Sequence, residues 1–191
     1  MSKPLVIVES PTKVRTIKKY LGSDFNVAAT VGHIKDLPSK DLGIDIENDF
    51  TPHYRTIPGK SKVLSQLRSA AGDTTDIYLA PDPDREGEAI AWHTAEVLKK
   101  KGRRFHRVLF HELTKKAILE AMNKASDLDR DKYEAQQARR ILDRLVGYQI
   151  SPLLWRKVKG GLSAGRVQSV SVRIICDRER AIQAFTPVEY W

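Results

Sequence analysis

The stretch IYLAPDPDREGE at residues 77–88 decides the fold prediction, because an apolar run passes directly into alternating prolines and acidic residues. A short apolar run bounded by turn residues is typical of a buried strand. A residue before a proline adopts extended geometry, so Asp82 and Asp84, two positions apart, are expected to point to the same side. A helix is expected from about Glu86 to Lys100. The stretch therefore predicts a strand, a turn that carries two carboxylates, and a helix.

The same alternation of strands and helices continues on both sides of this stretch. Further strands are predicted at residues 4–8, 26–31 and 107–110. Ser10-Pro11 predicts the start of a helix that stops near Gly22, and Thr114 predicts the cap of a helix through Met122. The segment 32–61, rich in Pro, Gly and Asp, is expected to form mostly loops. Such an order indicates an α/β fold whose mainly parallel sheet is flanked by helices.

After residue 127 the strand signals stop, and helices alone are predicted. One helix is expected to end near Gly147, and Ser151-Pro152 predicts a separate short helix. Gly160-Gly161 predicts a break before a last helix from about Ser163 to Ala184. The predicted organisation is an α/β domain at 1–127 and the start of a helical domain at 128–191.

Composition limits the class of protein. The 191 residues include 33 basic and 24 acidic side chains, with a net charge of −2 over residues 1–98 and +11 over residues 99–191. This asymmetry favours a metal site followed by a polyanion-binding surface, although a solvated basic helix face is the alternative. The single cysteine, Cys176, excludes an internal disulfide and a zinc site made of thiolates. No signal peptide or membrane-spanning run is recognisable, so a soluble intracellular protein is expected.

The acidic residues predict a metal site. Carboxylates that converge without cysteine or clustered histidine suit a hard cation such as Mg²⁺. Glu9 ends the first predicted strand, where it can move a proton, and Lys13 lies in the first helical turn, where phosphate binds readily. The alternative is that the carboxylates only cap a helix start. For Lys13 taken alone, a solvated side chain is the favoured interpretation.

Longer motifs identify a resemblance. Residues 9–13 (ESPTK) together with 82–88 (DPDREGE) resemble the Toprim domain of bacterial type IA DNA topoisomerases. Residues 138–148 (ARRILDRLVGY), 151–155 (SPLLW) and 162–169 (LSAGRVQS) resemble the helical domain that follows Toprim in that family. The resemblance runs from residue 5 to residue 191, and the Ser-Pro-Thr-Lys form favours the topoisomerase I branch over topoisomerase III.

The resemblance implies a role for each matching residue. It implies a Rossmann-like Toprim fold, with Glu9 as general acid/base at the scissile phosphate and Lys13 stabilising the pentavalent transition state. It also implies an Mg²⁺ site, which we expect at Glu9, Asp82, Asp84 and Glu86. The residues that it implies, or that helical spacing suggests, for single-stranded DNA binding are His33, Arg139, Arg140, Asp143, Arg144, Arg166, Gln168 and Arg173.

The basic region supports such a groove independently. Residues 139–180 carry a net charge of +7, and Arg166, Arg173 and Arg180 recur every seven residues along the last predicted helix. This row could follow a phosphate backbone, with Trp155 or Tyr148 as a stacking face. The alternatives are a solvated arginine face and aromatic residues that pack in a core.

By this resemblance the parent enzyme relaxes negatively supercoiled DNA by Mg²⁺-dependent single-strand cleavage, strand passage and religation, without ATP. The tyrosines at 20, 54, 78, 133, 148 and 190 all lack the Tyr-x-Arg-Thr/Ser context of the family's nucleophile. We therefore expect a truncated N-terminal part that is inactive alone and needs the remainder of the same polypeptide. From the resemblance we also expect a bacterial, cytoplasmic and nucleoid-associated protein that is monomeric. The alternatives are a free-standing Toprim nuclease and a non-catalytic DNA-binding module.

Overall fold

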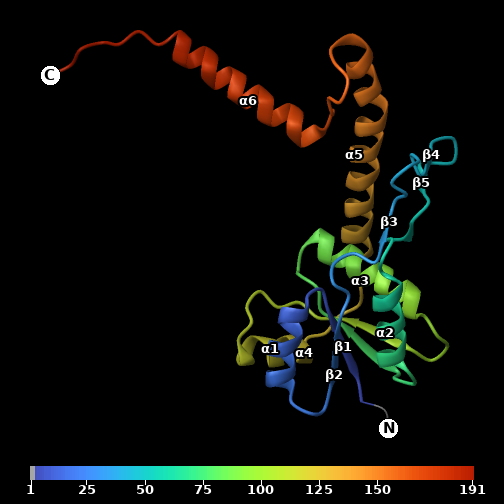
Figure 1. The fold of residues 1–191 in the computed structure, drawn as a ribbon. Coiled ribbons are helices and arrows are strands. Elements are labelled where there is room, and N and C mark those ends of the chain that lie inside the picture. Colours follow the sequence, from blue (N-terminus) through green and yellow to red (C-terminus); the bar gives the residue numbers. More distant parts are fainter. Residues whose placement is uncertain (1–2) are drawn as a thin grey trace. The chain divides into compact units, whose positions relative to one another are not determined.

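The computed structural model describes residues 3–191 (Figure 1), which divide into two compact units. The first unit ends at Ala138 and the second comprises Arg139–Trp191, so the division falls within the helix Arg130–Lys157 (α5). The domain boundary expected after residue 127 stays a prediction.

The first unit contains a parallel four-stranded sheet in the order β2-β1-β7-β8. Its strands are β1 (Leu5–Val8), β2 (Asn26–Ala29), β7 (Asp76–Leu79) and β8 (Arg104–Arg107). Two small antiparallel pairs lie in the segment predicted as loops: β3 (Lys35–Asp36) with β6 (Arg55–Thr56), and β4 (Ile44–Asp45) with β5 (Thr51–Pro52). The predicted α/β fold with a parallel sheet is confirmed.

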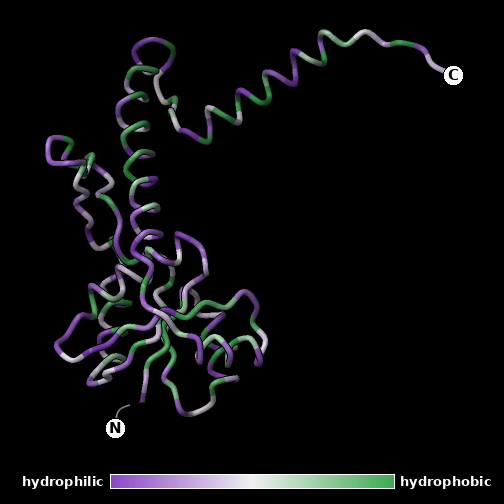
Figure 2. The backbone as a smooth tube through the Cα atoms, turned by 180° about the vertical axis from the view of Figure 1, so that it is seen from behind, coloured by the Kyte–Doolittle hydropathy of each residue, from purple (hydrophilic) through white to green (hydrophobic). Residues whose placement is uncertain are grey.

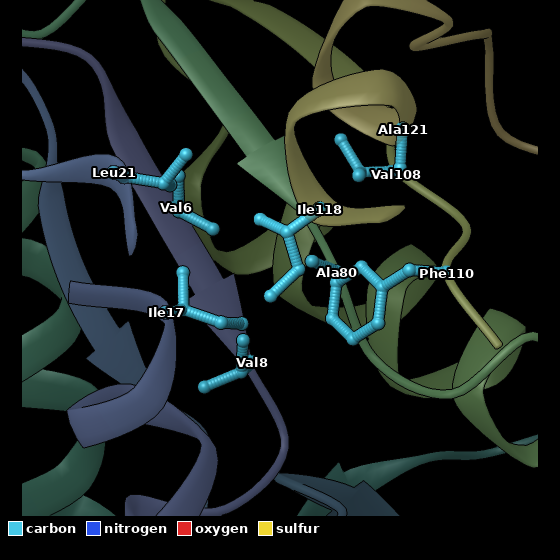
Figure 3. Packing of buried hydrophobic residues seen from close by; sticks show 9 residues of the cluster. All are labelled: Val6, Val8, Ile17, Leu21, Ala80, Val108, Phe110, Ile118 and Ala121. Atoms are coloured by element: carbon cyan, nitrogen blue, oxygen red, sulfur yellow. The ribbon is translucent and has the colours of Figure 1, made fainter. Parts of the chain in front are cut away.

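Helices cover both faces of this sheet (Figure 1). They are α1 (Pro11–Leu21), α2 (Ser61–Ala71), α3 (Arg85–Leu98) and α4 (Lys115–Asn123). Val6 and Val8 of β1 pack with α1 and α4 in one core cluster, part of which is seen in Figure 3. Leu5 and Ile7 pack with α2 and α3 in a second cluster on the opposite face. The continuous apolar run of β1 follows from this burial on both faces.

The predicted helix starts are confirmed by their caps. The Ser10 hydroxyl accepts a hydrogen bond from the backbone N–H of Lys13 at 3.4 Å, and the Thr114 hydroxyl accepts one from that of Ala117 at 3.3 Å. Gly22 ends α1 with φ +68°, a conformation that glycine adopts without steric cost. Side chain to backbone hydrogen bonds therefore fix where these helices begin, and the backbone conformation of Gly22 fixes where α1 ends.

The last strand of the sheet lies three residues earlier than predicted. Residues 107–110, of which the last three are apolar, suggested a strand, but β8 pairs Arg104 with Asp76 and Arg107 with Leu79. The Asp76 carboxylate accepts a hydrogen bond from Arg104 at 2.8 Å and lies 2.9 Å from His106 Nε2, so the polar strand residues find partners across the sheet. Val108 and Phe110, which follow β8, pack in the core of Figure 3 instead.

The second prediction that the structure corrects concerns the helices after residue 127. A helix end near Gly147 and a new start at Ser151 were expected, but α5 continues from Arg130 to Lys157 with Pro152 inside it. Proline removes one amide donor, and the helix carries this local interruption without ending. The break at Gly160-Gly161 is confirmed, with Gly161 at φ +82°.

The last helix, α6 (Arg166–Gln183), begins close to its predicted start and has no buried residue. Its apolar side chains, which include Val170 and Ile174, are exposed. The tube in Figure 2 alternates between hydrophobic and hydrophilic colours along this helix. Among residues 3–191, no helix is both long enough and apolar enough to cross a membrane.

Candidate active site

Three charged side chains from separate segments meet at the carboxyl ends of β1 and β7. Glu9 directly follows β1, Lys13 lies in the first turn of α1, and Asp82 follows β7 by three residues. The Lys13 ammonium donates a hydrogen bond to Glu9 Oε1 at 2.7 Å and another to Asp82 Oδ1. Because β1 and β7 are parallel neighbours, their carboxyl ends open at one edge of the sheet, where α/β proteins bind ligands.

The charges of this group stabilise one another. Burial lowers the pKa of Lys13, but hydrogen bonds with Asp82 and Glu9 outweigh it, so the pKa lies above its ordinary value. The Lys13 ammonium in turn holds the pKa of Asp82 below its ordinary value. The lysine is therefore a permanent positive charge at neutral pH, and Asp82 is ionised.

The two aspartates have different partners. Residues 81–84 form what we call the acidic loop, and Asp84 at its end is the N-cap of α3, with Oδ1 accepting a hydrogen bond from the Gly87 amide at 2.7 Å. The helix-capping interpretation thus describes Asp84 in this structure, whereas Asp82 faces Lys13. A Cβ atom on Gly87 would lie 2.0 Å from the Asp82 carbonyl oxygen, so this position requires glycine.

Glu86, on the first turn of α3, contacts His33. His33 Nε2 lies 3.2 Å from Glu86 Oε2, which also accepts a hydrogen bond from Gln136 Nε2 at 3.2 Å. Two residues before His33, the β-branched Val31 has φ +56°. The Gly32 amide, between them, donates a hydrogen bond to the Glu9 carbonyl at 2.9 Å. Backbone strain of this kind persists only where surrounding contacts enforce it.

The donor set fits a hard cation. Glu9, Asp82, Asp84 and Glu86 offer only carboxylate oxygens, the ligands that Mg²⁺ prefers. Among the described residues 3–191, no three His, Cys, Asp or Glu side chains lie close enough together to hold a metal ion. The positive charge beside Glu9 and Asp82 is supplied by Lys13 in this structure.

The second unit brings several of the predicted DNA-binding residues together. Asp143 of α5 accepts a hydrogen bond from Arg166 of α6 at 3.2 Å and lies 3.8 Å from Arg139 Nε. These three residues line a cavity of about 340 Å³ together with Val167, Val170 and Ser171. One carboxylate thus orients two arginines that line a cavity within this unit.

The other predicted contacts lie on the same two helices and the loop between them. Arg144 donates to the Tyr148 hydroxyl at 2.6 Å and covers its ring, and Arg173 lies 3.6 Å from Asp177. Gln168 Oε1 accepts from the Ser163 hydroxyl at 3.4 Å, and Arg140 is partly buried on α5. Trp155 is 51% exposed, with its indole N–H donating to the Leu162 carbonyl at 2.5 Å, so its ring is not part of a core.

Sequence reasoning missed the buried ion pair behind the acidic loop. Arg107 of β8 and Glu88 of α3 are each 1% exposed, and Arg107 Nε donates to Glu88 Oε2 at 2.8 Å. The two residues are 19 positions apart and lie on different elements, so neither helical nor strand periodicity relates them. The only signal in the sequence is the second glutamate of the Glu-Gly-Glu motif.

Comparison with known proteins places these observations in a family. Residues 4–113 match the Toprim domain family, and residues 127–191 match the DNA topoisomerase family. The structure is similar to that of full-length topoisomerase I from Thermotoga maritima in a monoclinic crystal form, with a TM-score of 0.87 and 49% sequence identity. The match covers 97% of this chain and 32% of that chain, so the present chain spans about a third of the length of its relative.

Proposed function

Since the chain belongs to the Toprim family and represents the Toprim-containing region of a bacterial type IA DNA topoisomerase, we propose that it supplies the phosphoryl-transfer site of an ATP-independent enzyme that relaxes negatively supercoiled DNA. The observation that carries the proposal is the group of Glu9, Lys13 and Asp82 at the carboxyl edge of the sheet. Cleavage of one strand, passage of another and religation are the steps that this site serves.

Lys13 and Glu9 divide the chemistry between them. The Lys13 ammonium stays protonated at neutral pH and sits at the N-terminal turn of α1, where a phosphate is favoured by charge and by exposed N–H groups. It stabilises the negative charge that develops on the phosphoryl oxygens. The Glu9 carboxylate, 2.7 Å from Lys13 Nζ, takes and returns the proton of the attacking or leaving oxygen.

Glu9, Asp82, Asp84 and Glu86 are the residues that would hold Mg²⁺. Bound there, the ion neutralises phosphate charge and orients the scissile group. Asp84 Oδ1 accepts the capping hydrogen bond from the Gly87 amide, and Glu86 is oriented by His33 and Gln136. Contacts within the chain therefore already hold the Asp84 and Glu86 carboxylates in the absence of substrate.

The second unit binds single-stranded DNA in this proposal. Arg139, Arg140, Arg144, Arg166 and Arg173 contact the phosphates, while Asp143 orients two of these arginines and Gln168 joins them at the start of α6. His33, which belongs to the first unit, is a further proposed contact to single-stranded DNA. The partner is single-stranded or underwound DNA, and the protein acts as a monomer in the bacterial cytoplasm, close to the nucleoid.

The chain alone should not relax DNA, because none of its tyrosines has the context of the family's nucleophile. Incubation with negatively supercoiled plasmid and Mg²⁺ should therefore leave the topoisomer bands unchanged. Nicked or linear product that disappears in the Asp82→Ala/Asp84→Ala double variant would establish the free-standing nuclease instead.

Magnesium binding tests the acidic site directly. Titration calorimetry with MgCl₂ should show binding to the wild-type chain and its loss in the Asp82→Ala/Asp84→Ala variant. Asp73→Ala, which removes an exposed carboxylate, is the matched control and should bind as the wild type does. Equal binding by all three proteins would mean that the acidic loop only caps a helix, as in a non-catalytic DNA-binding module.

DNA binding tests the second unit. Fluorescence anisotropy of a labelled single-stranded oligonucleotide should show affinity that falls steeply with salt, because phosphate contacts release counterions. Arg166→Ala should weaken binding and reduce the slope against log salt by about 1, as expected for one phosphate contact. Lys116→Ala, which removes an exposed charge from α4, is the control. An affinity that does not change with salt contradicts the proposal.

A further inference from the structure

Arg107 is the largest fully buried side chain of the described residues, although its charge makes burial costly. A buried ion is tolerated only when its charge is paired and its hydrogen-bonding groups are satisfied. Glu88 supplies the charge, with its Oε2 accepting from Arg107 Nε at 2.8 Å. The other N–H donors of this guanidinium also need acceptors.

The remaining donors bind backbone carbonyls, two of which belong to the acidic loop. Nη1 donates to the carbonyls of Pro81 at 2.9 Å, Val108 at 3.0 Å and Leu79 at 3.2 Å. Nη2 donates to the carbonyl of Asp82 at 2.7 Å. Because a guanidinium presents its donors in a rigid planar fork, these bonds together fix the backbone where β7 turns into the acidic loop.

The same carbonyl of Asp82 also lies close to Gly87, where an added Cβ would lie 2.0 Å from it. The Asp82 backbone is therefore close to both α3 and the Arg107 guanidinium. Its carboxylate accepts a hydrogen bond from Lys13, so the position of this backbone sets the point from which the carboxylate reaches the predicted catalytic lysine.

The ion pair also reaches the segment that leads into α5. Glu88 Oε1 accepts a hydrogen bond from the Asp129 amide at 2.8 Å. The backbone of Arg107 exchanges hydrogen bonds with that of Ser126, at 2.6 and 2.9 Å. One buried pair thus connects β8, α3, the acidic loop and the start of α5 within the first unit.

We propose that Arg107 is a positioning residue: through its bonds to the Pro81 and Asp82 carbonyls, with Glu88 holding its charge, it sets the acidic loop in the geometry that Asp82 needs. The part of this inference that concerns Mg²⁺ rests on the proposed function. The part that concerns the order of the loop does not.

Arg107→Lys tests the proposal, because lysine keeps the charge for Glu88 but lacks the planar fork. Hydrogen exchange followed by NMR at the Gly87 and Glu88 amides, which donate to Asp84, reports the order of the loop. Titration with MgCl₂ reports the affinity of the protein for Mg²⁺. We expect faster exchange at these amides and Mg²⁺ affinity lower by about 10-fold or more, as for other residues that orient metal ligands.

Arg103→Lys is the matched control. Arg103 also donates to four backbone carbonyls, those of Leu98, Ala71, Gly72 and Thr74. It precedes β8 and so lies at the amino ends of the strands, away from the acidic loop at their carboxyl ends. It should lower stability in urea unfolding without changing exchange in the acidic loop or Mg²⁺ affinity. Equal effects of the two variants on the loop would overturn the proposal, since they would reflect general destabilisation.

A third protein keeps the test decisive if Arg107→Lys fails to fold. The Arg107→Met/Glu88→Leu double variant replaces the pair by apolar side chains, a change that buried ion pairs often tolerate. A folded protein with rapid exchange at the amides of residues 87 and 88 supports the proposal, and wild-type exchange there refutes it. If the wild-type chain binds no Mg²⁺, the proposed function fails, while the exchange data still decide the role of Arg107.

Discussion

Replacing His93 by phenylalanine should remove a large part of the acid sensitivity of the first unit. His93 lies on α3 and is 2% exposed, and its Nδ1 atom has no hydrogen-bond partner among the described residues. Its ring packs against those of Tyr54 and Tyr133, with centroid distances of 4.7 and 5.7 Å. Burial lowers the pKa of His93 to about 4, because the charged imidazolium would lose its hydration there.

The neighbouring charges oppose one another and do not reverse this effect. Glu96 and Asp36 favour the protonated ring, whereas Lys35 and His33 disfavour it. Above pH 6.5 the histidine is neutral in both the folded and the unfolded chain, so it adds no pH dependence. Between pH 6.5 and pH 4 only the unfolded chain takes up the proton, and stability falls as the pH falls. A pKa lowered from 6.5 to about 4 corresponds to roughly 3 kcal/mol of lost stability at the acid end.

Urea unfolding at pH 7.5, 6.5, 5.5 and 4.5 measures this loss. Trp92, whose ring stacks on Tyr133 at 4.7 Å, is the fluorescent reporter in a background where Trp155 and Trp191 are replaced by phenylalanine. At pH 7.5 His93→Phe should differ from the parent by less than about 1.5 kcal/mol, since the swap nearly conserves volume and removes an unpaired buried nitrogen.

A second histidine variant serves as the control. His111→Gln removes an exposed histidine, and its stability should follow the parent at each pH. His93→Phe should instead lose less stability than the parent as the pH falls from 6.5. If the two stability curves stay parallel down to pH 4.5, the assignment of a neutral, buried histidine is wrong.

Three further predictions follow from single contacts. Gly87→Ala would gain about 1 kcal/mol of helix propensity in an open helix, but here its Cβ would lie 2.0 Å from the Asp82 carbonyl oxygen. Thermal unfolding should therefore show a net loss of stability, and calorimetry should show weaker Mg²⁺ binding. Thr114→Ala removes the cap of α4 and should cost about 1 kcal/mol in urea unfolding, with Thr114→Ser retaining most of it. Asp76→Asn removes a carboxylate whose pKa Arg104 and then His106 hold well below its ordinary value. Its stability deficit at pH 7 should therefore shrink as the pH falls below about 4, where the native carboxylate's advantage is lost; a constant deficit in urea unfolding across that range would contradict this account.

Much of the α/β unit could be predicted because its signals are local. The apolar run of β1, the Ser10 cap and the stop at Gly22 each depend on neighbours within a few residues, and the structure confirms them. The placement of β8 was wrong because strand position depends on pairing with β7, where Asp76 meets Arg104, and not on apolar content alone. The helix α2 was not predicted from the sequence, since its turn-rich surroundings concealed its apolar spacing.

The candidate site was predictable in its members but not in its contacts. Glu9, Lys13 and Asp82 stand out because strand ends and helix starts are visible in the sequence, and the structure brings them together. Asp84 accepts a hydrogen bond from the Gly87 amide and Asp82 one from Lys13, a difference that the sequence did not predict. Arg107 and Glu88 could not be paired from sequence, because their burial exists only once α3 packs on the sheet.

The position of β1 within the sheet has a consequence for synthesis on the ribosome. β1 emerges first, yet it ends up between β2 and β7, with all four of its residues buried. β2 follows closely, but β7 begins roughly 70 residues after β1 ends, which corresponds to about 4 to 14 s of translation at ordinary rates. Throughout that interval one edge of an entirely apolar strand has no partner. The growing chain therefore exposes an aggregation-prone edge for seconds, and a chaperone that shields residues 5–8 should raise the yield of folded protein.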